Sequence, residues 1–151
     1  MLLSQHFTLD ELTVTTTGLP NEPSSTEVIE RLRKVCTEVL EPVRHHFGKA
    51  IVLHSGYRSP AVNKAVKGSP SSQHCKGEAA DFHVAGVTVL EVAQWLSNSD
   101  IEYDQLILEN YVAGSPSSGW VHCSYSVRKR QMDLTKFKGS SDYYPGILLA
   151  P

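Results

Sequence analysis

The sequence has few cysteines, and their spacing argues against two kinds of stabilising site. Cys36, Cys75 and Cys123 are odd in number and widely spaced, and no Cys-x-x-Cys pair occurs. Disulfide frameworks use even sets of cysteines and structural zinc knuckles use close pairs, so neither is expected. Cys123 directly follows a histidine on an expected strand, where neighbouring side chains point to opposite faces, which favours a small core residue.

The sequence also lacks long apolar runs and a strong charge of either sign. No apolar run approaches the ~18 residues that cross a membrane, and the amino-terminal MLLSQHFTLDEL lacks the basic and apolar regions of a signal peptide. A net charge of -2 gives no global attraction to nucleic acid or anionic membrane. We therefore expect a monomer made in the cytoplasm, with no nucleic-acid partner and no membrane insertion.

What is present is the composition of an ordinary globular domain. A chain of 151 residues, 40% hydrophobic and 20% charged, is long enough to bury a core without staples. We expect one domain over residues 1–151, with the informative motifs at 50–127 and a tail at 128–151. The partner must be identified from a site within it.

Capping signals and apolar periodicity predict the helices. Phe7 to Leu12 resembles a helical turn that begins at Thr8, and Ser24-Ser25-Thr26-Glu27 reads as a capping box. An apolar stripe follows from Val28 to Phe47, with Pro42 expected to kink or end it. Thr88-Val89-Leu90-Glu91 is a second capping box before another amphipathic helix.

Short runs rich in β-branched and aromatic residues predict four strands. They are Ala50 to His54, Ala79 to Val84, Asp104 to Tyr111 and Trp120 to Val127. The last two are separated by Val112 to Gly119, which suggests a long-looped hairpin. Two helices with mostly antiparallel strands indicate an α+β domain.

The segment from Ser72 to Phe82 carries the clearest chemical signal. His74 and Asp81 supply an imidazole and a carboxylate, both good zinc ligands, and the intervening Gly77 lets the backbone turn tightly. A catalytic zinc site needs three protein ligands and one open position. His122, in Gly119-Trp120-Val121-His122, is the best third ligand.

The pattern His-x-x-Gly-x-Ala-x-Asp, preceded by Ser-x, resembles the zinc D-alanyl-D-alanine carboxypeptidase family. The later Trp-Val-His and the earlier Ser-Gly-Tyr-Arg-Ser match in the same order, so the resemblance spans Ser55 to Ser124. It implies a small α+β fold like that of hedgehog and D-Ala-D-Ala peptidases, with flanking helices and an antiparallel sheet that carries the ligands of a Zn²⁺ ion.

The resemblance also implies roles for two further residues. Arg58 matches the family arginine that stabilises the substrate carbonyl or carboxylate, and an arginine fork suits that task. Ser72 would position the substrate or the ligand loop. From the residues alone, Arg58 could instead brace the Gly56 to Pro60 turn, and Trp120 could be either core or substrate wall.

One departure from the family pattern concerns the proton acceptor. Many members place an acid three residues before the last histidine, where this chain has Gly119. If the hairpin closes symmetrically, Tyr111 pairs with Trp120 and Glu109 pairs with His122 on the same face, so Glu109 is the preferred general base. A one-residue slip would turn Glu109 away. Asp104 and Glu78 are the alternatives.

The remaining basic residues and histidines are not expected to take part in catalysis or zinc binding. The basic stretch that begins at Arg128 is either a solvated face or an aid to approach toward anionic wall polymers. The five other histidines are expected not to bind zinc, namely His6, His45, His46, His54 and His83.

Two functions follow from these features. The preferred one is a zinc peptidase that cuts peptidoglycan stem peptides in endopeptidase or carboxypeptidase mode. A phage endolysin or a particle-associated wall hydrolase is expected, acting on the wall or in the periplasm after release. The alternative is a non-catalytic zinc-binding module with a structural or wall-binding role, which Gly119 keeps open.

Overall fold

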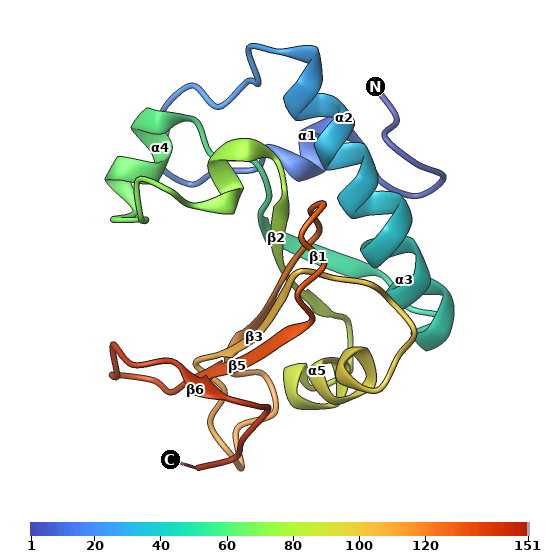
Figure 1. Cartoon of the computed structure of the whole chain (residues 1–151), viewed down its shortest axis with the longest axis vertical. Coiled ribbons are helices and arrows are strands. Elements are labelled where there is room, and N and C mark those ends of the chain that lie inside the picture. Colours follow the sequence, from blue (N-terminus) through green and yellow to red (C-terminus); the bar gives the residue numbers. More distant parts are fainter. Residues whose placement is uncertain (151) are drawn as a thin grey trace.

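A computed structural model describes residues 1–150 as helices packed around one mixed sheet (Figure 1). The sheet has six strands in the order β1-β2-β4-β3-β5-β6, and all neighbours are antiparallel except β3 and β5. The strands are β1 (Ile51–Ser55), β2 (Ala79–Val84), β3 (Gln105–Glu109), β4 (Trp120–Ser124), β5 (Met132–Lys136) and β6 (Tyr144–Pro145). The expected α+β class is confirmed.

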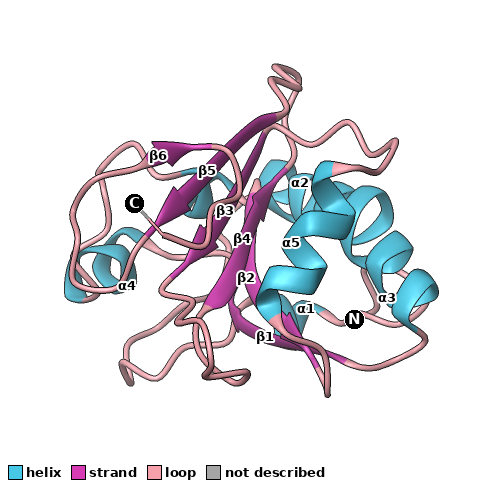
Figure 2. Ribbon diagram, turned by 90° about the horizontal axis from the view of Figure 1, so that it is seen from below, coloured by secondary structure: helices cyan, strands magenta, loops and turns pink. Residues whose placement is uncertain are grey.

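The helical elements are short and lie mostly on one side of this sheet. They are α1 (Leu9–Leu12), α2 (Thr26–Val35), the π-helical turn η1 (Cys36–Leu40), α3 (Glu41–Phe47), α4 (Pro60–Ala65), the 3₁₀ turn η2 (Gln73–Lys76) and α5 (Val89–Ser97). Figure 2 shows α2, α3 and α5 on one side of the sheet and α4 on the other. In the described part of the chain, no helix is long and apolar enough to cross a membrane.

The predicted long helix is present and contains a π-helical turn. Ser25 caps α2 by accepting a hydrogen bond from the Val28 amide, one residue later than the predicted box. The turn η1 widens the helix just before Pro42, which occupies the first turn of α3, where its missing N–H costs little. The predicted stripe is fully buried at its centre, at Leu32, Val35, Val39 and Val43.

Strand alternation divides the sheet into a core face and a face that carries the site. The core side chains are fully or almost fully buried, and on β2, β4 and β3 they are Ala80, Phe82, Val84, Val121, Cys123, Leu106 and Leu108. Cys123 is therefore the core residue that was predicted. The intervening residues, including Asp81 and His122, point to the opposite face.

The predicted pairing of the β3–β4 hairpin is wrong by two residues. Glu109 pairs with Trp120, and Ile107 takes the place opposite His122 that was assigned to Glu109. The ladder ends early because Asn110 has a φ of 58° and its amide donates to the carbonyl of Lys136 instead. A shift of two residues preserves the side-chain face, so Glu109 still shares a face with His122.

Two regions contain structure where the sequence analysis predicted none. Residues 60–65 form α4, capped by Ser59 and begun by Pro60, although they carry little apolar periodicity. The segment after Arg128, expected as a tail, adds β5 and β6 to the sheet, and β5 runs parallel to β3. This segment therefore forms one edge of the sheet.

Candidate metal and catalytic site

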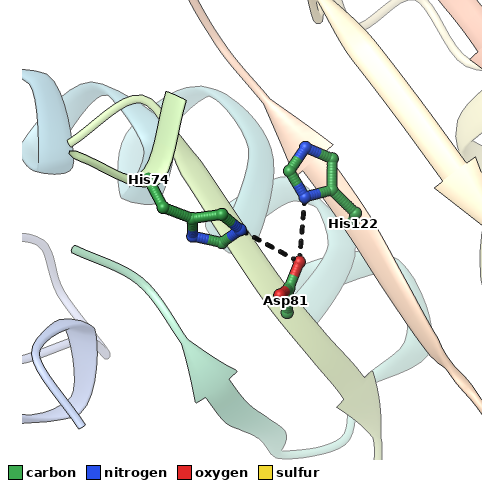
Figure 3. Close-up of side chains that lie close together, drawn as sticks. All are labelled: His74, Asp81 and His122. Atoms are coloured by element: carbon green, nitrogen blue, oxygen red, sulfur yellow. Dashed lines mark hydrogen bonds and ion pairs between the residues drawn. The ribbon is translucent and has the colours of Figure 1, made fainter. Parts of the chain in front are cut away.

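His74, Asp81 and His122 come together on the open face of the sheet, as predicted (Figure 3). His122 Nδ1 lies 2.9 Å and His74 Nε2 3.3 Å from the same carboxylate oxygen, Asp81 Oδ1. Asp81 and His122 are partners across β2 and β4, while His74 enters from η2. All three residues are buried, and their ligand atoms lie within 4.8 Å of one another.

The backbone around His74 fixes which ring nitrogen faces the other two ligands. His74 Nδ1 lies 2.7 Å from the carbonyl oxygen of Gly56, which can only accept, so Nδ1 carries the proton. His74 Nε2 is then left with a free lone pair directed at Asp81. A backbone carbonyl in this role is the usual outer partner of a zinc-bound histidine.

The ligand loop is held by Ser72 and Gly77 at its two ends. Ser72 Oγ accepts a hydrogen bond from the His74 amide, which caps η2. Gly77 ends η2 with a φ of 78°, and a Cβ there would lie 2.7 Å from the carbonyl oxygen of Val28. Helix α2 therefore leaves room only for glycine at this turn, as the predicted tight return to Asp81 requires.

These three residues fit a zinc ion by their chemistry. Two imidazoles and one carboxylate are a known donor set for catalytic zinc, and they leave the fourth tetrahedral position open. Burial alone raises the pKa of Asp81, but electrostatic attraction to the neighbouring His74 and His122 rings outweighs it and holds the pKa below its usual range. Asp81 is therefore ionised at neutral pH, as a metal ligand must be.

Arg58 reaches the same group from the turn after β1. Arg58 Nη2 lies 3.4 Å from Asp81 Oδ2, the carboxylate oxygen that does not face the histidines. Its other nitrogens contact Ser55 Oγ at 3.1 Å and Asn63 Oδ1 at 3.3 Å. Arg58 thus braces its turn and orients the ligand carboxylate, and its half-buried side chain also lines the cleft.

Glu109 lines the same cleft, on the strand next to His122. Because it pairs with Trp120, it is a diagonal neighbour of His122, at roughly 7 Å between Cβ atoms. Burial raises the pKa of Glu109 and the Asp81 carboxylate adds to this, while His122, Lys136 and Arg58 offset part of it. Such a shift toward neutrality suits a group that accepts and returns a proton.

Gly119 occupies the position where many members of the family carry an acid. In this chain it has a structural role. Its φ is 75°, and a Cβ there would lie 2.4 Å from the carbonyl oxygen of Glu109 and 2.7 Å from the amide nitrogen of Tyr111. The early end of the β3–β4 ladder therefore requires glycine at this position. The nearest carboxylate on the adjacent strand is that of Glu109.

The two alternative proton acceptors have other surroundings. Asp104 is fully buried, and Arg130 Nε donates to its Oδ1 at 2.7 Å, with Gln73 and Ser126 bound to Oδ2. Burial raises the pKa of Asp104, but the hydrogen bonds from Arg130 outweigh it and lower the pKa. Glu78 contacts Gln73 at 3.4 Å and does not line the cleft. Neither carboxylate lines the cleft around the metal group.

The cleft around the group has a volume of about 720 Å³. Trp120, for which a substrate wall was one of the two predicted roles, lines it, and its buried indole N–H has no hydrogen-bond partner among the described residues. Tyr143, from the segment before β6, lines it as well. Burial raises the pKa of Tyr143, with Glu109 and Asp81 adding to the shift. No local sequence signal marks Tyr143, because long-range strand pairing brings it there.

The other histidines lie outside the group of His74, Asp81 and His122. His6 pairs with Glu41 at 2.6 Å, and His46 stacks on Trp95. His54 and His83 contact each other on β1 and β2. In the described residues, the group of His74, Asp81 and His122 is the one set of three or more such side chains placed to hold a metal.

The fold and the site define a metallopeptidase domain with a buried His-Asp-His group. The family model described as Peptidase M15 matches residues 5–124, which include all three ligands, Arg58 and Glu109. The chain therefore belongs to the M15 peptidase family, the zinc D-alanyl-D-alanine carboxypeptidase family. None of the curated proteins compared with the chain matches it.

Proposed function

We propose that this protein is a zinc-dependent peptidase that hydrolyses peptide bonds in the stem peptides of bacterial peptidoglycan. The observation that carries the proposal is the shared cleft, in which Glu109 and Arg58 stand beside the buried His74, Asp81 and His122 group. Membership of the M15 family supports a peptide substrate. We also propose that the protein acts as a phage endolysin or as a particle-associated wall hydrolase.

The metal supplies the chemistry that the side chains lack. Zinc held by His74, Asp81 and His122 would polarise the scissile carbonyl and make a water molecule acidic enough to lose its proton at neutral pH. His74 and His122 contribute neutral nitrogens and Asp81 contributes a charge, while Arg58 keeps the carboxylate of Asp81 in its orientation.

Glu109 carries the proton in the proposed reaction. Its carboxylate accepts a proton from the attacking water and then donates the same proton to the leaving amine as the peptide bond breaks. Its raised pKa makes the carboxylate a stronger base for the first step, and a pKa nearer the working pH still lets the protonated form return the proton in the second. Glu109 ends the cycle ionised again.

The walls of the cleft suit a peptide that carries free carboxylates. Arg58, Lys67, Lys76, Arg128 and Arg130 all line it, opposed by the carboxylates of Asp81 and Glu109. Arg58 is the residue proposed to bind the substrate carbonyl or carboxylate, and Ser72 and Trp120 are proposed to contact the peptide. Tyr143 adds a phenol to the lining of the cleft. The basic side chains would attract an acidic stem peptide.

The non-catalytic alternative rested on Gly119, and the presence of Glu109 in the cleft favours the enzyme over it. The deciding experiment incubates purified protein with peptidoglycan, first after chelation and then with added zinc, and counts new amino termini. We expect release only with zinc. If no amino termini form at saturating zinc, the enzyme proposal fails and the wall-binding module replaces it.

A further inference from the structure

A second pair of metal-ligating side chains lies outside the His74, Asp81 and His122 group. His54 on β1 and His83 on β2 contact each other, with His54 Nε2 2.7 Å from His83 Nδ1. Their ring centroids are 4.8 Å apart and their planes differ by 29°. His54 is exposed and His83 half-buried, so the pair is open to dissolved ions.

The facing nitrogens share one hydrogen bond, so at most one proton lies between them in the neutral pair. At least one lone pair therefore faces the partner ring. Neutral imidazole is the form that binds metal ions. A metal ion can replace the shared proton once the two rings move apart.

The facing nitrogens of the pair are closer together than the ligand atoms of the main group. The two nitrogens are 2.7 Å apart, while the ligand contacts around Asp81 Oδ1 are 2.9 Å and 3.3 Å. Two nitrogens on one tetrahedral zinc ion, at the usual bond lengths, lie about 3.3 Å apart. Small side-chain rotations of His54 and His83 would open that space, and the backbone of β1 and β2 could stay in place.

We propose that His54 and His83 form a second, weaker metal site that binds a divalent ion preferring imidazole, such as Zn²⁺, Ni²⁺ or Cu²⁺. Water fills the remaining positions. This site is weaker than the main one because two protein ligands hold the ion instead of three, and because neither ligand is a carboxylate that supplies charge.

The location of the pair gives the second site a consequence for activity. His83 follows Asp81 by two residues on β2, so both point to the same face of the sheet. His54 lines a cavity together with Arg58, Asp81 and Trp120. The Arg58 charge opposes a cation there, although Asp81 already pairs with it at 3.4 Å. If the proposed function holds, zinc in excess of one equivalent obstructs the peptide and inhibits hydrolysis.

The test is the zinc stoichiometry of the folded full chain, measured by equilibrium dialysis. We expect wild type to bind two equivalents, the second more weakly, and His54→Gln and His83→Gln to lose the second one. His45→Gln, which changes an exposed histidine on α3, should keep both. His122→Gln, which leaves the ion pair of Arg58 and Asp81 in place, should weaken the first equivalent and keep the second.

Two results would overturn the second site. One is a wild-type protein that binds a single equivalent at saturating zinc, and the other is a second equivalent retained by both glutamine variants. Imidazole nitrogen spectra of wild type add a readout without substitution, because only the rings of His54 and His83 should shift with the second equivalent. These readouts need no hydrolysis, so they separate failure of this site from failure of the proposed peptidase.

Discussion

Glu109 on β3 is the strand partner of Trp120 on β4, and this pairing places a carboxylate on the cleft face beside His122. Many members of the family carry an acid at the position of Gly119, but the backbone of this turn leaves room only for glycine. Glu109 on the neighbouring strand supplies a carboxylate instead. Proton transfer in the proposed reaction therefore depends on Glu109.

We expect Glu109→Gln to lower kcat by roughly 10²- to 10⁴-fold, because the amide cannot accept the proton of the attacking water. Zinc binding should be unchanged, since Glu109 is outside the ligand group. Initial rates on a purified stem peptide, together with zinc stoichiometry, measure both. Glu78→Gln is the matched control and should keep wild-type rates. Full activity in Glu109→Gln would assign the proton to another group.

We expect Gly119→Ala to destabilise the fold more than Gly114→Ala, although both glycines have positive φ in the same loop. A Cβ at position 114 meets nothing within 4 Å, whereas at 119 it meets backbone at 2.4 Å. The left-handed conformation costs each alanine about 1 kcal/mol, and the clash should add about 2 kcal/mol at position 119. Urea unfolding measures the difference. Equal losses would show that the hairpin relaxes around the added methyl group.

The ligands could be predicted from sequence because their signals are local. His74 and Asp81 lie seven residues apart around Gly77, and strand alternation alone put Asp81 and His122 on the face opposite Phe82 and Cys123. The face of Glu109 was also predicted correctly. Its exact partner was not, because the end of the ladder depends on the positive φ of Asn110, which no composition rule specifies.

We expect Asp104→Asn to destabilise the protein by about 2 kcal/mol at neutral pH, because the hydrogen bonds from Arg130 lose their charged acceptor. The folded protein holds the pKa of Asp104 below the unfolded value of about 3.9. The stabilisation is therefore complete above that unfolded value and is lost as the pH falls through the folded pKa. Urea unfolding of both proteins at several pH values tests this. A difference that does not shrink in acid would mean that the charge of Asp104 contributes little.

We expect Tyr143→Phe to raise KM by about three- to tenfold, because one hydrogen bond from the phenol to the peptide is lost. The value of kcat and the zinc content should stay close to wild type. Tyr111→Phe is the control, since Tyr111 does not line the cleft. Steady-state kinetics on a stem peptide separate the two constants. An unchanged KM would remove Tyr143 from the substrate wall.

The elements that sequence analysis missed depend on signals that are weak or distant. Helix α4 has six residues, too few for periodicity, although Ser59 before Pro60 is a cap followed by proline at the first helical position. Strand β5 joins the sheet by pairing in parallel with β3, and β6 pairs with β5. The local sequence does not indicate such long-range pairing. The position of Tyr143, directly before β6, could therefore not be predicted.

The most direct test of the central claim is a zinc titration of the metal-free protein during peptidoglycan hydrolysis. We predict that the rate rises with added zinc and reaches its maximum at one equivalent. Asp81→Ala, which removes the ligand shared by both histidine contacts, should stay inactive at that ratio. Hydrolysis by the metal-free protein, or an Asp81→Ala rate equal to wild type, would contradict a zinc peptidase built on His74, Asp81 and His122.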